Sequence, residues 1–200
     1  MPAPVDHHAR RRQITAAARR VICRGGLDAV TFQSVAAEAG ISVRLVQYYF
    51  GTKKDFLLAT HRSVMDDAGT RFTRRRNELG PDATPREAIR AVLTELLPLD
   101  EQRREETLVL GAFGWSAITG GGITAEDTFA APRALTTIVA DQLRRAPTGE
   151  DAGDPEADAD LVVMAAGGLA QGMLQGYSTS RTPLELVEHL LDRVLGSTER

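Results

Sequence analysis

The sequence contains only one cysteine, Cys23, among its 200 residues. A single cysteine excludes an internal disulfide and leaves no thiolate cluster that could hold a metal ion. A reducing compartment is therefore expected, and the cytoplasm fits best. Cys23 itself is interpreted as a small, buried apolar residue, with a redox-sensing thiol as the alternative.

Long uninterrupted hydrophobic runs are also missing. The longest stretch without a charged residue, Leu161 to Ser180, is interrupted by four glycines and two glutamines, which makes it a poor membrane span. The first residues contain no apolar segment of the kind that a signal peptide needs. We expect no membrane partner.

Catalytic motifs are absent as well. The four histidines, at positions 7, 8, 61 and 189, are scattered, and no HExxH, GxSxG or complete P-loop pattern occurs. We therefore expect no enzymatic activity, no metal and no cofactor.

Charge is present but unevenly distributed. The net charge of the whole chain is -3, yet residues 1–60 carry nine arginines and lysines against four aspartates and glutamates. A basic N-terminal segment followed by an acidic remainder suggests that the N-terminal segment binds a polyanion. The arginine triplet at 10–12 is either a basic arm that reaches DNA or a solvated helix start.

The hydrophobic pattern predicts an all-α protein, because apolar residues recur at spacings of three and four and alternating β-branched runs are missing. Capping boxes with proline at the first helical position start helices after Thr84 and Thr182. Pro132 either kinks one helix or starts it late. Helices are predicted over about 10–24, 32–39, 43–49, 53–76, 85–97, 101–119, 126–145, 156–177 and 183–195.

Two domains are predicted from helix length and polarity. Residues 1–50 form short helices with tight turns, preceded by an arm. Residues 51–200 contain longer helices, of which 108–118 and 161–174 are apolar on every side and suit the middle of a bundle. The helix at 53–76 would span both.

The segment from Thr31 to Phe50 has the pattern of a helix-turn-helix. Thr31 can cap a first helix that Gly40 ends, and Ser42 can cap a second helix that places Leu45 and Val46 inward. The second helix of such a unit enters the major groove, where arginine pairs with guanine and glutamine with adenine. Its outward residues, the candidates for reading bases, are Val43, Arg44, Gln47 and Tyr48. The candidates for phosphate contacts, at helix starts and flanks, are Thr31, Ser42, Tyr49 and Lys53.

The stretch "TFQSVAAEAGISVRLVQYYFGTKKDFLLAT", Thr31 to Thr60, resembles the DNA-binding domain of TetR-family transcriptional regulators. The likeness covers roughly residues 10–60. It includes two aromatic residues, a phenylalanine, a small residue and then lysine at the end of the recognition helix. It implies an all-helical homodimer with a three-helix DNA-binding unit and a larger ligand-binding and dimer-forming bundle. From residue 85 onward the chain is faintly similar to the BetI-type branch.

The resemblance places Arg44 and Gln47 on the family's base-reading positions. The family's phosphate-contact positions fall on Thr31, Ser42, Tyr49 and Lys53. Gln47 departs from the family pattern, which most often has tyrosine there. Either a phosphate contact is lost or a base contact is gained.

A cavity between helices of the bundle is the default site for an effector. Helical stretches 107–122 and 161–180 contain no charged residue, which favours a neutral, largely apolar ligand. The candidate lining residues are Trp115, Phe113, Thr107, Ser116, Met164, Gln171 and Gln175.

Glycines at four-residue spacing suggest a smooth strip on one helix, since each costs roughly 1 kcal/mol relative to alanine. We assign this strip to a dimer interface, and loose internal packing or ligand clearance is the alternative. The predicted interface residues are Gly168, Gly172, Gly176, Leu184, Val187, Leu191 and Val194.

These patterns together predict a ligand-responsive transcriptional regulator that binds double-stranded operator DNA as a homodimer. Repression is the usual mode of the family that the sequence resembles. The alternatives are an architectural DNA-binding protein without an effector, and a redox-responsive regulator that acts through Cys23.

Overall fold

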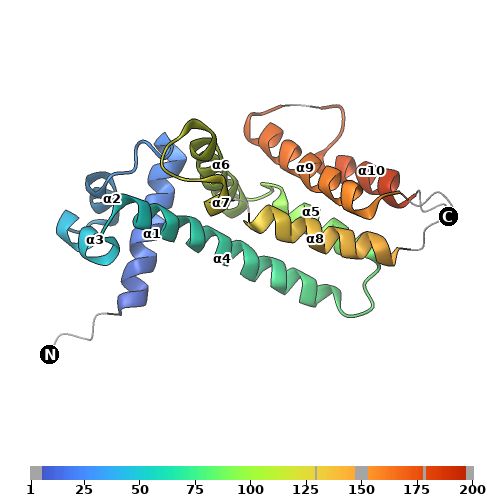
Figure 1. Cartoon of the computed structure of the whole chain (residues 1–200), viewed down its shortest axis with the longest axis horizontal. Helices are drawn as coiled ribbons and strands as arrows, with labels where there is room; N and C mark the ends of the chain where they lie inside the picture. Colours follow the sequence, from blue (N-terminus) through green and yellow to red (C-terminus); the bar gives the residue numbers. More distant parts are fainter. Residues whose placement is uncertain (1–5, 129, 147–152, 178, 197–200) are drawn as a thin grey trace. The chain divides into compact units, whose positions relative to one another are not determined.

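A computed structural model describes residues 6–128, 130–146, 153–177 and 179–196. Every regular element that these residues form is an α-helix, as the sequence predicts (Figure 1). None of these helices has the length and apolar character needed to cross a membrane. The helices are α1 (His7–Gly25), α2 (Phe32–Ala39), α3 (Val43–Phe50), α4 (Lys53–Leu79), α5 (Pro85–Leu96), α6 (Glu101–Thr119), α7 (Ala125–Thr128), α8 (Ala130–Arg145), α9 (Pro155–Leu174) and α10 (Pro183–Leu195).

Local capping explains where several helices begin. Thr84 and Thr182 each form the predicted capping box, accepting a hydrogen bond from the backbone N–H three residues later, with proline at the first helical position. Asp154 caps α9 in a similar way and is also followed by proline. These signals act within four residues, so the sequence alone is sufficient to predict them.

The helix expected over 126–145 corresponds to α7 and α8, and Pro132 is the third residue of α8. Residue 129, which links the two, lies outside the described residues, and with it the choice between a kink and a late helix start. The helix expected to reach 177 ends at Leu174, because Gly176 adopts a positive φ of 72°.

The chain forms two compact units, and the division differs from the one predicted near residue 50. The first unit comprises residues 1–67 together with 108–128, and the second comprises 68–107 with 129–200. Both α4 and α6 thus contribute to each unit. Cys23 packs, partly buried, against the core of the first unit.

Each unit has its own hydrophobic core. The core of the first unit joins α1–α3 to the start of α4 and the end of α6, with Phe56 and Phe113 among its largest fully buried side chains. In the second unit α8 packs against α9, and α5 packs against α8 and α10. Full burial of one such large side chain contributes about 1.5–3 kcal/mol, so these cores hold the elements that carry the candidate sites.

Candidate nucleic-acid interface and ligand cavity

A helix-turn-helix occupies residues 31–50, as predicted. The Thr31 hydroxyl accepts a hydrogen bond of 2.9 Å from the Ser34 N–H, and the Thr31 N–H donates one of 2.9 Å to the Ser34 hydroxyl. Gly40 ends α2 in the left-handed conformation, with φ 67° and ψ 33°. Ser42 then caps α3 by accepting from the Leu45 N–H at 3.3 Å. The turn between α2 and α3 is thus fixed by its own residues.

Helix α3 presents polar and aromatic side chains outward. Val46 and Phe50 are buried in the core of the first unit, whereas Arg44 and Gln47 are exposed and Tyr48 is 73% exposed. Val43, also predicted to face out, is only partly exposed and packs against the core. An exposed guanidinium, amide and phenol on one short helix suit the edges of bases.

The residues predicted to contact phosphates surround this helix. Thr31 and Ser42 lie exposed at the starts of α2 and α3, and Lys53 lies exposed at the start of α4. Tyr49 is half-buried, and its ring packs edge-on against the ring of Tyr48 with centroids 5.4 Å apart. Backbone N–H groups at helix starts favour anions, so these positions have the right polarity for phosphates.

Helix α1 holds the end of α3 in place. The Arg11 guanidinium donates to the carbonyl oxygen of Tyr49 at 2.8 Å and lies 4.5 Å from the centroid of the Phe50 ring. Arg10, Arg11 and Arg12 all belong to α1 and not to an arm. Any arm before Asp6 lies outside the described residues.

Some of the basic charge at the front of the sequence is used inside the fold. Arg20 and Arg24 both form ion pairs with Glu38, joining α1 to α2. Hydrogen bonds from Arg20 and then Arg24 lower the pKa of Glu38. Lys54 pairs with Asp127 at 3.7 Å. These three cations are therefore less available to DNA than Arg44 and Lys53.

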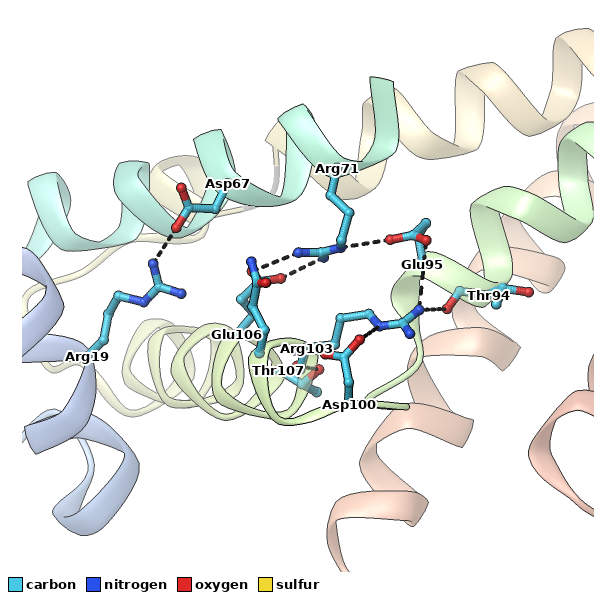
Figure 2. A network of polar contacts seen from close by, with 10 residues as sticks. Arg19, Asp67, Arg71, Thr94, Glu95, Asp100, Arg103, Glu106 and Thr107 are labelled. Atoms are coloured by element: carbon cyan, nitrogen blue, oxygen red, sulfur yellow. Dashed lines mark hydrogen bonds and ion pairs between the residues drawn. The ribbon is translucent and has the colours of Figure 1, made fainter. Parts of the chain in front are cut away.

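A buried polar network joins α4, α5 and α6 within the second unit (Figure 2). The Arg71 guanidinium donates to both carboxylate oxygens of Glu106, at 2.8 and 2.7 Å, and to Glu95 at 2.7 Å. Arg103 donates to the Thr94 carbonyl oxygen at 3.1 Å and to Asp100 at 2.9 Å. Hydrogen bonds to Glu106 raise the pKa of Arg71 above its ordinary value, against the opposing effect of burial. The sequence reasoning missed this network, because no local pattern links residues that far apart.

A cavity of about 540 Å³ lies in the second unit, between the end of α4, the turn that follows it, α5 and α8. Its buried part includes Ala91 and Val92, with Phe72 and Ile138 half-buried. Its exposed rim includes Arg76, Asn77, Gly80, Pro81 and Arg145. The cavity therefore has an apolar floor and a cationic rim.

The residues that the sequence suggested for a ligand pocket do not line this cavity. Phe113 is buried in the core of the first unit, where His61 packs edge-on against it, and Ser116 is also buried. The Thr107 hydroxyl donates to the Arg103 carbonyl oxygen at 2.7 Å. The other four, which are exposed, are Trp115, Met164, Gln171 and Gln175. These seven residues thus lie at core and surface positions outside this cavity, and their role in binding an effector stays a prediction.

The predicted dimer residues divide into three groups. Val187 and Leu191 are buried in the core of the second unit, so they cannot belong to a surface that a partner covers. Gly176 lies beyond the end of α9, where its positive φ explains the glycine. The remaining four are exposed or half-buried: Gly168, Gly172, Leu184 and Val194. The sequence reasoning missed Leu161 and Tyr177, which are large, apolar and exposed.

Among the described residues, no group of three or more histidine, cysteine, aspartate or glutamate side chains is placed so that it could hold a metal ion.

Comparisons with known proteins agree with the helix-turn-helix. Residues 14–60 match the family model for bacterial regulatory proteins of the TetR family. The transcriptional regulator BetI of Rhizobium meliloti (strain 1021) is 30% identical over 191 residues, which are 93% of this chain and 86% of that protein. PksA of Bacillus subtilis (strain 168), also a transcriptional regulator, is 31% identical over 113 residues. That match spans about half of PksA, 54% of its length, and 56% of this chain.

Solved structures show the same fold. A transcriptional regulator from Rhodococcus sp. Rha1 has a TM-score of 0.75 and 30% identity, covering 93% of this chain and 94% of that one. A regulator from Saccharomonospora viridis, solved with choline, has a TM-score of 0.70 and 22% identity, covering 94% of each chain. The match to BetI of Rhizobium meliloti spans most of both proteins, and the exposed face of α3 agrees with it. The chain therefore belongs to the TetR family of bacterial transcriptional regulators.

Proposed function

We propose that the protein is a repressor that binds a palindromic operator as a homodimer and is released by a small, largely apolar effector. The single observation that carries the proposal is the exposed face of α3, where Arg44, Gln47 and Tyr48 project from a helix held by the buried Val46 and Phe50. Side chains of this kind on a recognition helix suit direct readout in the major groove.

The roles within the operator complex follow from side-chain chemistry. Arg44 can pair bidentately with guanine and Gln47 with adenine, while Tyr48 and the flanking Val43 can contact thymine methyl groups. Thr31, Ser42, Tyr49 and Lys53 would fix the register by contacting phosphates on either side. Gln47, where tyrosine is usual, would therefore gain a base contact in this protein.

A homodimer is expected because one recognition helix makes too few base contacts for strong specificity. Two-fold symmetry would place two such helices on half-sites about 34 Å apart. The proposed interface uses α9 and α10, with Gly168, Gly172, Leu184 and Val194. The exposed Leu161 on α9 supports this choice, since a large apolar side chain in water favours a partner surface.

An effector is favoured over a purely architectural role because the second unit contains a cavity within the size range of small-molecule sites. The choline-bound regulator from Saccharomonospora viridis indicates that this fold can hold a small molecule. Redox control through Cys23 is the weaker alternative, because that side chain is half-buried against the core. We place the protein in the cytoplasm, where its operator would be.

The proposal is tested by footprinting the full-length protein on DNA upstream of its own coding region. We expect protection of a palindrome whose half-sites lie about one helical turn apart, on one face of the duplex. A titration on unrelated DNA of equal length is the control. If operator and unrelated DNA bind equally at physiological salt, the protein is not a sequence-specific regulator.

A further inference from the structure

The cavity in the second unit differs in charge from the body that contains it. Residues 61–200 carry 15 arginines and lysines against 23 aspartates and glutamates, so this part of the chain is acidic. Among the described residues that line the cavity, the charged ones are nevertheless both arginines, Arg76 and Arg145. If the charged residues of 61–200 were distributed at random, the rim of the cavity would carry more carboxylates than arginines. The observed rim has the opposite charge.

The two arginines also differ from their sequence neighbours. Arg74 and Arg75 both pair with Glu78 on the same helix, and Arg144 pairs with Asp141 and Glu156. Among the residues described by the structure, Arg76 and Arg145 have no carboxylate within the 4.0 Å of an ion pair. The Arg145 guanidinium makes only a long hydrogen bond of 3.5 Å to Gln142. Within the described part of the chain, neither guanidinium at this cavity is therefore neutralised by a carboxylate.

The inner part of the cavity has the opposite character. Ala91 and Val92 are buried, and Phe72 and Ile138 close the sides. An apolar chain or ring in contact with these side chains would lose its water and gain about 25 cal/mol for each Å² covered. The floor therefore suits the body of a ligand and the rim suits its head group.

We propose that this cavity is the effector site and that its ligand is an amphipathic organic anion, with an apolar body on the floor and a carboxylate or phosphate between Arg76 and Arg145. This inference rests on the proposed function, because it names the chemistry of the effector. It replaces the neutral ligand expected from the sequence, since the uncharged segments behind that expectation do not line the cavity. Guanidinium groups hydrogen-bond to carboxylates and phosphates through paired N–H donors, which gives the site its selectivity.

The test compares four ten-carbon probes by calorimetry on the full-length protein without DNA: decanoate, decyl phosphate, 1-decanol and decyltrimethylammonium. We expect one or both anions to bind at least about tenfold more tightly than the alcohol, because an ionic hydrogen bond is added to the same apolar contact. The preferred anion then identifies the head group. The proposal is overturned if all four probes bind equally, or if neither anion binds with a dissociation constant below about 1 mM.

Matched variants locate the site. The double variant Arg76→Gln/Arg145→Gln should lose about tenfold in affinity for the preferred anion and little for decanol. Arg74→Gln/Arg144→Gln, which changes the adjacent paired arginines, should bind the anion as the unaltered protein does. Thermal unfolding of both variants verifies that each is folded. Unchanged anion binding by the first variant, or an equal loss in both, places the anion elsewhere and overturns the proposal.

The experiment separates this inference from the regulator itself. A specific footprint without anion binding overturns the ligand class and leaves the regulator standing. Anion binding without any specific footprint supports the cavity and contradicts the operator function. Where both are found, adding the anion should remove the footprint, and the double arginine variant should keep it.

Discussion

Gln47 and Lys53 lie close together in the sequence and are both exposed, yet they should affect DNA binding differently. Gln47→Ala should cost about 1–3 kcal/mol on the operator and relax the preference at one base pair, because a paired amide is removed from a base edge. Lys53→Ala should weaken binding to all DNA sequences alike, because one phosphate contact is lost. The slope of the logarithm of the binding constant against the logarithm of salt concentration should become shallower by about one. Dissociation constants on operator and random DNA, at several salt concentrations, measure both effects.

Lys54 provides the control for this comparison. It stands next to Lys53 but pairs with Asp127 at 3.7 Å, so Lys54→Ala should change the salt slope less. Arg44→Ala should behave like Gln47→Ala. If Gln47→Ala and Lys53→Ala lower specific and random binding by the same factor, the assignment of base and phosphate contacts is wrong.

His61 should make stability depend on pH. Its side chain is 8% exposed and its ring lies 5.0 Å from that of Phe113. Burial, and then the charge of Arg62, lower its pKa, while Asp127 raises it by less. The unfolded chain therefore takes up a proton first as the pH falls below about 6.5, and stability is lost from there toward the lower folded-state pKa.

Urea unfolding at pH 7.5 and pH 5.5 measures this effect. The free energy of unfolding should be lower at pH 5.5 than at pH 7.5. His61→Leu should reduce this difference because it removes the titrating group. His189→Leu, at an exposed position on α10, is the control and should preserve it. An undiminished pH difference in His61→Leu would show that other groups are responsible.

At the scale of helices, the strongest polar constraint is the network that joins α4 to α5 and α6. Arg71→Met should destabilise the chain by about 3 kcal/mol, because the charge of the buried Glu106 carboxylate would lose the guanidinium that compensates it. Arg71→Met/Glu106→Leu should recover much of that loss, since both charges are then removed. Arg74→Met, at an exposed pair with Glu78, should cost less than about 0.5 kcal/mol. Denaturant unfolding measures all three, and equal losses for the two single variants would contradict the importance of burial.

Helix positions were predictable because their signals are local. The box at Thr84, the glycine at 40 and the outward residues of α3 each depend on side chains within a few positions of one another. The role of Pro132 was left open because a proline is compatible with either a kink or a helix start.

The cavity of the second unit was not predictable in the same way. Its walls come from the end of α4, from α5 and from α8, and Arg76 and Arg145 are far apart in the sequence. Which face of a helix turns toward a cavity depends on packing against helices elsewhere in the chain. Val187 and Leu191 illustrate the same limit, since their apolar spacing on α10 is equally consistent with a core and with an interface.

For the whole molecule, the central prediction is dimerisation through α9. Gly168 is exposed, and a side chain added there would point into open space. Gly168→Leu should therefore leave the monomer folded but weaken the dimer, because the added side chain would separate two closely packed helices. Sedimentation at micromolar concentration distinguishes the two species.

Gly69 on α4 offers a matched control, being exposed with equally open space around it. Gly69→Leu should sediment as the unaltered protein does. A monomer in the unaltered protein would refute the dimer itself, and an unaffected dimer in Gly168→Leu would move the interface away from this glycine.

The first unit is assembled from two separate stretches of chain, residues 1–67 and 108–128. A genetic crossover just after the helix-turn-helix would therefore transfer DNA specificity without Val109, Phe113 and Ile123, which complete the core beneath it. The buried Val46 and Phe50 would then pack in a core completed by whatever side chains the recipient supplies. Hybrid regulators made between members of this family should thus inherit a new operator most reliably when the end of α6 is exchanged together with the N-terminal segment.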